Sequence, residues 1–184
     1  MDFKDLIGYW KTEITGRPEE RFKLVRCWRR VRRKEIDHFM FWFRLAQYLH
    51  RKPSGIINYR KMASKIHTGL VSRHNIDILL DAEIGPGMKI YHRVGIVIAD
   101  RVRIGTNLRI RQNTTIGIVG KKEGLILIGN DVNIGANACI IGDDLNIGDN
   151  VTIGAMAFVN HDIASDSICY TKHVSSIRSL MKGK

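Results

Sequence analysis

The apolar residues of this chain follow two different spacings, one in its first part and another in the rest. In the segment EIDHFMFWFRLAQYLH, residues 35–50, apolar residues recur three or four positions apart, which is the spacing of one face of an α-helix. Pro53 and Gly55 follow and end that helix, and a second helix is expected over roughly residues 56–68. We therefore predict a helical region over residues 1–75.

Further along, an apolar residue recurs at every sixth position and is often followed by glycine. A six-residue repeat is a signature of a β-helix, in which each unit supplies a short strand and a corner, and three units close one coil. Glycine suits the corners, because tight corners need backbone angles that other residues avoid. We predict a β-helix over residues 76–162 and a C-terminal tail over residues 163–184. The repeating apolar positions are Ile78, Ile84, Ile90, Ile96, Val102 and Leu108, then Ile128, Ile134 and Ile140, and after a one-residue slip Ile147, Ile153 and Val159.

The repeat is interrupted between Thr114 and Ile128. The intervening sequence TTIGIVGKKEGLIL is longer than two units and holds three glycines and two consecutive lysines, so we predict a protruding loop over residues 117–127. Such a loop is either a tolerated surface insertion or a lip over a ligand groove. In the second case Lys121 or Lys122 would face a phosphate group.

The positive charge of the chain is concentrated in the helical region. The 184 residues carry a formal net charge of +12, and residues 17–61 hold fourteen Lys and Arg against four Asp and Glu. The densest run is RCWRRVRRK, residues 26–34. Such a patch is either a solvated helix face or a contact for an anionic lipid surface, an acidic polymer or a phosphorylated ligand. No helix-turn-helix, zinc-finger or RNA-binding signature accompanies the run, so nucleic acid is not an expected partner.

The cysteines and the hydrophobic stretches of the chain indicate its cellular compartment, and the cysteine spacing does not indicate a metal cofactor. The three cysteines are few and widely spaced, which indicates neither a disulfide framework nor a metal site and favours a reducing cytoplasm. The first residues, MDFKDLIGYWKTE, do not form a secretory signal. The most hydrophobic stretch, FMFWFRLAQYL, is about half as long as a membrane span and contains Arg44. We therefore expect a cytoplasmic protein without a transmembrane segment.

One histidine, His92, lies within the regular part of the repeat beside Tyr91. The histidine is either a polar corner residue of a repetitive scaffold or a catalytic base. The second role is chemically reasonable, because an imidazole titrates near neutral pH. It can take a proton from an attacking hydroxyl and return it to a leaving group.

The repeat resembles the hexapeptide-repeat acyltransferases, and within them the serine acetyltransferases and the related polysaccharide acetyltransferases. The resemblance implies a left-handed parallel β-helix, so the expected fold class is mainly β with an N-terminal α-helical extension. It also implies a homotrimer with active sites in the clefts between neighbouring β-helices. The resemblance covers roughly residues 70–160 and is carried by YHRVGIVI (91–98), IRQNTTIG (110–117), IGANACIIGD (134–143) and IGDNVTIGAMAFV (147–159).

This resemblance also implies roles for individual residues. His92 falls on the catalytic histidine, and Asp77 falls on the aspartate that orients it, fifteen residues upstream and almost one coil away. Such an aspartate would fix the tautomer of the imidazole and stabilise its cation, whereas a cap on the first coil is the alternative role for Asp77. The implied acetyl donor is acetyl-CoA. Its implied contacts are Gly117, Ala136 and Ala155 along the pantetheine arm and Lys121 or Lys122 at a phosphate.

On the acceptor side the chain departs from the serine acetyltransferases. Their loop histidine is missing, with Leu125 near its place, and Gly124 replaces an arginine beside it. Tyr91 stands where they have an aspartate directly before the catalytic histidine. A closed site for a zwitterion tolerates the loss of charge partners poorly, so these changes point to an acceptor other than serine.

We therefore expect an acetyl-CoA-dependent O-acetyltransferase that acts on a sugar hydroxyl of a bacterial surface polysaccharide or its precursor. Tyr91 would pack on the sugar ring or serve only in protein packing. The basic helical region would attract an anionic or lipid-linked carbohydrate, or contact the anionic inner face of the membrane. Two alternatives stay open. One is a serine acetyltransferase of cysteine synthesis, and the other is a non-catalytic β-helix scaffold, which a buried His92 or one remote from any cleft would favour.

Overall fold

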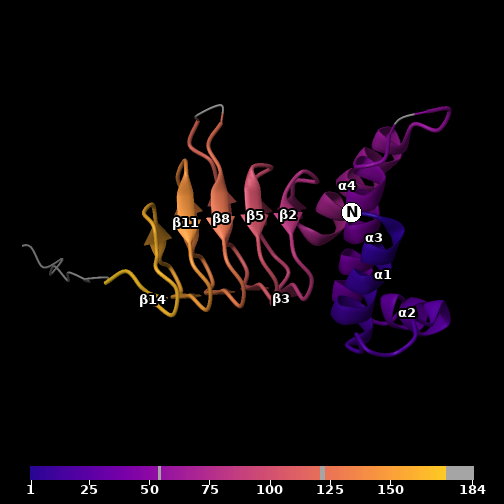
Figure 1. Ribbon diagram of the computed structural model, residues 1–184, viewed down its shortest axis with the longest axis horizontal. Helices are drawn as coiled ribbons and strands as arrows, with labels where there is room; N and C mark the ends of the chain where they lie inside the picture. Colours follow the sequence, from indigo (N-terminus) through magenta and orange to yellow (C-terminus); the bar gives the residue numbers. More distant parts are fainter. Residues whose placement is uncertain (54, 121–122, 173–184) are drawn as a thin grey trace, which may run out of the picture.

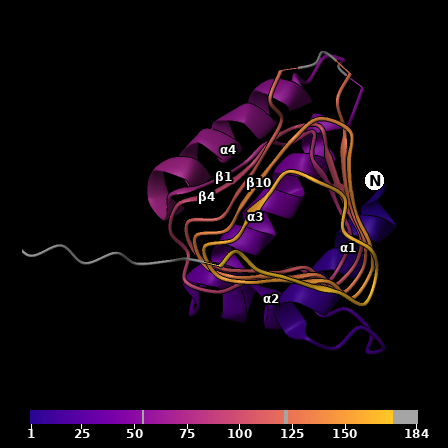
Figure 2. The same cartoon turned by 90° about the vertical axis from the view of Figure 1, so that its left-hand side faces the viewer.

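The computed structural model describes residues 1–53, 55–120 and 123–172. An N-terminal helical region packs on one end of a three-sided parallel β-helix (Figures 1 and 2). The predicted fold class, mainly β with a left-handed hexapeptide β-helix and an N-terminal α-helical extension, is confirmed. Within the described ranges, no helix is long and apolar enough to cross a membrane.

The helical region is built around one central helix, α3. Because α1, α2 and α4 all contact α3, it is apolar on nearly every side. The last helix continues to His74, further than expected, and Asn75 ends it in the left-handed conformation. The helices are α1 (Phe3–Trp10), a π-helical turn η1 (Lys11–Thr15), α2 (Leu24–Val31), α3 (Glu35–His50) and α4 (Tyr59–His74).

The β-helix has three parallel sheets, and each successive coil adds one strand to each sheet. The first sheet contains β1 (Ile76–Ile78), β4 (Ile96–Ile98), β7 (Thr115–Gly117), β10 (Cys139–Ile141) and β13 (Phe158–Val159). The second contains β2 (Glu83–Ile84), β5 (Val102–Ile104), β8 (Ile126–Ile128) and β11 (Leu145–Ile147). The third contains β3 (Lys89–Ile90), β6 (Arg109–Ile110), β9 (Asn133–Ile134), β12 (Thr152–Ile153) and β14 (Ile168–Cys169).

Columns of buried aliphatic side chains fill the interior, as the repeat predicted. Strand register stacks equivalent positions of successive coils directly over one another. Each such position keeps its apolar group away from water, which is the main stabilising term for this fold. In the first sheet the column consists of Ile78, Ile98, Ile116, Ile140 and Val159, all of them almost completely buried.

The pairing of the strands shows that the six-residue repeat is displaced by two residues after His92, which the predicted spacing did not include. Ile90 pairs with Ile110 in the third sheet, and Ile98 pairs with Ile116 in the first. The corner between β3 and β4 therefore contains two more residues than the corner that follows it one coil later. The predicted markers Ile96, Val102 and Leu108 belong to a second inward column rather than to the first. Both columns are apolar and buried, so the sequence spacing alone did not reveal the shift.

A column of left-handed residues runs along the corner between the third and first sheets. Asn75, Asn113, Asn137 and Met156 all have φ between 53° and 59° there. Gly95 joins this column with φ 66°, and a Cβ atom at Gly95 would lie 2.4 Å from the Asn113 side-chain oxygen. Glycine is thus required at 95 by both backbone conformation and space.

The helical region supplies hydrogen-bond donors to the open edge of the first coil. The edge carbonyl of Ala82 accepts from the side chains of Gln47 and Arg51, and that of Ile78 lies 3.0 Å from His67 Nε2. Arg44 Nη1 donates to the Ile84 carbonyl at 2.9 Å and Nη2 to the Gly85 carbonyl at 3.0 Å. An unpaired strand edge is thereby covered by side chains rather than by another strand.

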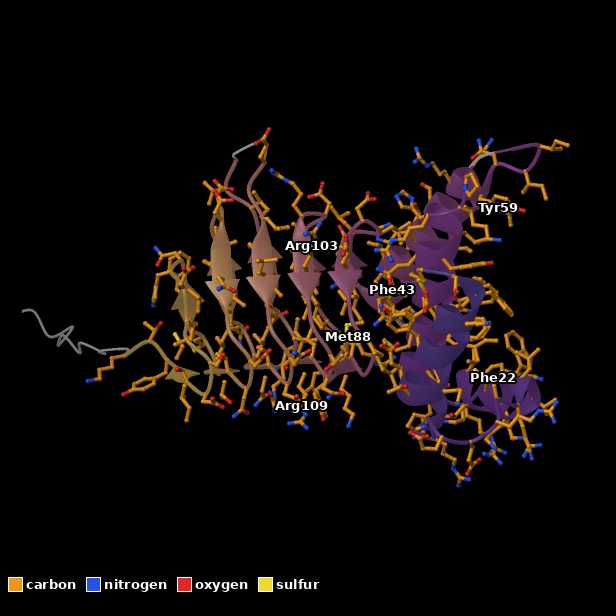
Figure 3. All side chains as sticks on the ribbon, in the orientation of Figure 1. Phe22, Phe43, Tyr59, Met88, Arg103 and Arg109 are labelled. Atoms are coloured by element: carbon orange, nitrogen blue, oxygen red, sulfur yellow. The ribbon has the colours of Figure 1, made fainter. Side chains whose placement is uncertain are left out.

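Arg44 is buried in an ion pair at this junction. Its guanidinium forms two hydrogen bonds with Glu13, at 3.0 and 2.6 Å, and stacks over the Tyr9 ring at 4.1 Å. The side chains of Arg44 and Glu13 are only 1% and 0% exposed. Phe43 of α3 and Met88 of the first coil lie at the same junction (Figure 3). The ion pair therefore joins η1, α3 and the first coil.

Loss of one partner of this buried pair should strongly destabilise the fold. We expect Glu13→Gln to lower the free energy of unfolding by about 3–5 kcal/mol, because it leaves the Arg44 charge buried without its counter-ion. Urea denaturation followed by circular dichroism measures the loss. The matched control is Glu35→Gln, which breaks an exposed, solvent-screened pair with Arg73 and should leave the free energy of unfolding nearly unchanged. Equal losses in the two variants would contradict the structural role of Arg44.

Candidate active site

The corner between the third and first sheets brings several of the predicted site residues into one line. His92, Ala136 and Ala155 each lie two residues after the inward residue of a third-sheet strand. Gln112 holds the same position in the coil between His92 and Ala136. Sequence analysis missed Gln112, although its equivalent spacing after Ile110 was the available signal.

The two extra residues at this corner form a bulge that carries His92. His92 has φ 55°, and its carbonyl accepts a hydrogen bond from Val94 N at 2.8 Å. Most of the other described non-glycine residues with positive φ are Asn or Asp, which tolerate this conformation better. A non-glycine residue held in this region carries backbone strain, and such strain clusters at functional sites. The His92 side chain is exposed, so the burial that would favour a scaffold role is not found.

Asp77 lies on the first sheet, one strand before β4. Strand register places Asp77 opposite Val97, five residues after His92, because the bulge lengthens this coil to twenty residues. The buried oxygen Oδ1 of Asp77 lies 3.4 Å from His67 Nε2 of α4, and no hydrogen bond with suitable geometry satisfies it within the described chain. His67 was not a predicted site residue. The pairing of Asp77 with His92 stays a prediction.

Tyr91 has a cationic neighbour in the next coil. The guanidinium carbon of Arg111 lies 5.4 Å from the centre of the Tyr91 ring, close enough for a cation–π contact. Arg111 Nη1 also donates to the Asn133 side chain at 2.8 Å, which holds the guanidinium against the coil. Tyr91 remains 42% exposed. Sequence analysis did not identify Arg111, because its proximity to Tyr91 follows from strand register.

Gly117, where the predicted loop begins, lies at the opposite edge of the first sheet. Gly117 ends β7, and the chain returns at Ile126 to begin β8. Coils that span this loop have 24 residues, six more than three regular units. Lys121 and Lys122 lie outside the described residues. Gly124 approaches Asp143 so closely that a Cβ atom there would lie 2.6 Å from Asp143 Oδ1.

A hollow of about 880 Å³ lies on a different face, between the second sheet and the helical region. Tyr9, Arg51, Glu83, Arg103 and Asp149 are among its lining residues, and it contains none of the predicted site residues. The predicted site residues that the structure describes are therefore not gathered around this hollow. They lie along two separate corners. Among the described residues, no group of three or more His, Cys, Asp and Glu side chains could hold a metal ion.

His38 and His74 form a partly buried contact between α3 and α4, with His38 Nδ1 3.2 Å from His74 Nε2. The pKa of His74 is lowered to about 4, mainly by burial and next by the charge of His38, with Arg73 and Arg93 adding to the effect and Glu35 opposing it. Burial also lowers the pKa of His38. Both imidazoles are therefore neutral in the folded protein near neutral pH.

The known proteins to which this chain is similar are serine acetyltransferases. No protein-family model matches the chain. The chain is 34% identical over 133 residues to serine acetyltransferase of Helicobacter pylori, which covers 71% of this chain and 74% of that protein.

Two solved structures extend the comparison. Serine acetyltransferase isoform 3 from Entamoeba histolytica, in complex with cysteine, has a TM-score of 0.71 and 26% identity over 96% of this chain. Neisseria gonorrhoeae serine acetyltransferase in complex with serine has a TM-score of 0.63 and 25% identity over 72% of this chain. This chain spans 60% of the first of these chains and 52% of the second.

The lowered pKa of His74 predicts a pH-dependent stability. The pKa of the unfolded histidine has its ordinary value of 6.5, so below that pH the unfolded state gains a proton that the folded state resists until about pH 4. Stability should be constant above about pH 6.5 and fall below it, by about 2 kcal/mol at about pH 5 for this residue. Urea titrations across this range test it, with His74→Gln and, as control, the exposed His161→Gln. An undiminished acid loss in His74→Gln would contradict the assignment.

Proposed function

The chain belongs to the serine acetyltransferase family, and we propose that it transfers an acetyl group from acetyl-CoA to the hydroxyl of serine. The observation that carries the proposal is the position of His92. It lies exposed on a strained bulge, in line with the small residues Ala136 and Ala155 on successive coils. We place this reaction in the cytoplasm, and the free thiols of Cys27, Cys139 and Cys169 fit a reducing compartment.

The expectation of a carbohydrate acceptor was wrong. The relatives and solved structures described above are serine acetyltransferases, and one of those structures contains serine. That expectation rested on the replacement of three acceptor-side residues, at Tyr91, at Gly124 and near Leu125. A charged residue that is missing at one sequence position can be replaced by a residue of another coil. Arg111, which lies beside Tyr91, is such a residue.

In the proposed reaction His92 acts as the general base. Its unprotonated nitrogen takes the proton of the serine hydroxyl as the oxygen attacks the thioester carbonyl carbon. The tetrahedral intermediate then collapses, the carbon–sulfur bond breaks, and the imidazolium returns the proton to the departing thiolate. Asp77 would stabilise the imidazolium and fix the tautomer, provided that it approaches His92 in the working site.

The corner beyond His92 fits the pantetheine arm of acetyl-CoA. Ala136 and Ala155 have small side chains that leave the backbone of the corner accessible. The side-chain oxygen of Gln112 is buried without a hydrogen-bond partner, and an amide N–H of the pantetheine arm could donate to it. Lys121 or Lys122 would meet a phosphate group of acetyl-CoA.

Two separated half-sites support a homotrimer. His92, Ala136 and Ala155 lie at one edge of the first sheet, and Gly117 with the loop lies at the other edge. One chain therefore cannot place its own loop beside its own His92 corner. In a closed ring of three chains, the loop of one chain can cover the His92 corner of its neighbour, which completes three equivalent sites.

Arg111 supplies the cation that the serine carboxylate requires. Its guanidinium is stacked on Tyr91, one coil from His92, and only Nη1 is used in its bonds to Asn133 and Ile134. The other guanidinium N–H groups are suited to a carboxylate. This arrangement replaces the loop arginine whose place Gly124 occupies.

A substitution at His92 tests the catalytic role. His92→Asn should lower kcat by about 10²–10⁴-fold with stability unchanged, because asparagine accepts the left-handed backbone but is not a base. Thiol release from acetyl-CoA, with and without L-serine, measures the effect. The control is His161→Asn, which removes an exposed histidine in a turn. Near-normal serine-dependent turnover in His92→Asn would show that His92 is a corner residue and not the base, whereas no serine-dependent turnover in the wild type would favour the non-catalytic scaffold.

A substitution at Arg111 tests the acceptor. Arg111→Met should raise KM for serine by about tenfold to a hundredfold while KM for acetyl-CoA changes little, since a charge-assisted hydrogen bond is lost. Arg109→Met, two residues earlier on the exposed face, is the matched control. With 2-aminoethanol, which lacks the carboxylate, wild type and Arg111→Met should perform alike. A comparable rise in both KM values would instead indicate a purely structural role for Arg111.

A further inference from the structure

We propose that the helical end of the molecule is a docking surface for membranes rich in anionic lipid. The surface consists of α2 (Leu24–Val31) and of residues 51–53 and 55–58, which lie between α3 and α4. The proposal concerns an end of the molecule that the acetyl-transfer chemistry does not use, and it does not depend on the proposed reaction.

α2 is amphipathic, and part of its apolar surface has no protein partner. Cys27 and Val31 are buried against the rest of the helical region. On the outer side, Leu24 is 58% exposed, Val25 is 71% exposed and Trp28 is 44% exposed. The Trp28 ring contacts the edge of Phe41 with the ring centres 6.0 Å apart, so its orientation is fixed while much of it faces solvent. A tryptophan on such a face is typical of contact with the interfacial region of a bilayer.

The apolar side chains of α2 are surrounded by positive charge. The segment from Lys23 to Lys34 has seven basic residues and no acidic one. Arg26 and Arg30 are paired with Glu20 and Asp37, which lie outside the segment. The remaining cations include three arginines that line a hollow of about 460 Å³ together with Val25 and Trp28, namely Arg29, Arg32 and Arg33. Basic residues beside an anionic surface each contribute about 1 kcal/mol of attraction.

A second basic and apolar segment lies at the same end of the molecule. Ile56 is fully exposed and Ile57 is 52% exposed, directly before α4. Basic residues flank them, among them Lys52, Arg60 and Lys61. Figure 1 shows α2 and the connection from α3 to α4 at the end remote from β14, and Figure 3 shows Phe22 and Tyr59, which adjoin the two segments, at that end. A planar surface at this end could contact both segments.

The chemistry of the surface favours a membrane over other anionic or protein partners. A second copy docked on the same patch would bring two dense sets of arginines together, and like charges repel. A nucleic acid would use the arginines through its phosphates, but it would leave the exposed Leu24, Val25 and Ile56 without a function. An anionic bilayer satisfies both features, because headgroups meet the arginines and the acyl boundary receives the apolar side chains.

The proposed trimer would strengthen this attachment. In a ring with its axis along the β-helices, the three helical ends would face the same direction. Three weak contacts on one surface then act together, and their combined affinity exceeds that of one contact. The catalytic corners would lie on the sides of the coils, away from the bilayer plane.

The test is co-sedimentation of the full-length protein with lipid vesicles. We expect binding to phosphatidylcholine vesicles that contain about 30% phosphatidylglycerol, little binding to phosphatidylcholine alone, and weakening by salt. Arg29→Glu/Arg33→Glu should weaken binding by about thirtyfold or more. The matched control, Lys89→Glu/Arg109→Glu, makes the same charge change on the exposed third sheet and should bind like wild type. Thermal unfolding and acetyl-CoA turnover verify that each variant is folded.

Apolar insertion requires a separate variant. Val25→Ser/Trp28→Ser keeps every charge, and it should also lose most of its binding to anionic vesicles. If this variant binds as wild type does, the patch is a general polyanion site and the membrane proposal is overturned. Equal binding of wild type to neutral and anionic vesicles, or equal losses in the two charge-reversed variants, would also overturn it. So would self-association in sedimentation velocity that Val25→Ser/Trp28→Ser abolishes.

Discussion

The fold depends on satisfying the open edge of the first β-helix coil. A β-helix satisfies its backbone groups by stacking, and the first coil has no preceding coil to supply donors. Arg44 resolves this by donating to the carbonyls of Ile84 and Gly85 while Glu13 neutralises its charge. The helical region and the β-helix therefore form one structural unit, because the first coil depends on the helical region for its hydrogen-bond donors. Its attachment fixes where α2 lies relative to the long axis of the molecule.

A second constraint, strand register, explains the position of His92. The following coil keeps equivalent residues in line with the first, so two extra residues between β3 and β4 are accommodated by bulging outward at the corner. The bulge between β3 and β4 does this, and Gly95 restores the left-handed column directly after it. His92 consequently projects from an otherwise uniform scaffold. A regular coil there would have left this corner with the same geometry as its neighbours.

The sequence predicted the fold class because the period of six directly reflects burial of the isoleucine columns. It did not predict the phase after His92, since Ile96 and Ile98 are both apolar and both buried. The resemblance predicted roles for His92, Ala136 and Ala155, whereas the roles proposed for Gln112 and Arg111 required the register of coils of unequal length. The acceptor was predicted wrongly because each sequence position was compared separately with its counterpart in the serine acetyltransferases. Residues from neighbouring coils can replace one another in space without being aligned in sequence.

The uneven charge of the chain also separates two functions. Ten of the twelve excess positive charges lie in residues 17–61, so the rest of the chain is nearly balanced. The acetyl transfer proposed at the His92 corner therefore does not require the strong basicity of the molecule. Serine is a small zwitterion with no net charge, and a distant cluster of arginines would do little to attract it. The basic helical end needs a different partner, and its exposed apolar side chains indicate that this partner has both anionic and apolar parts.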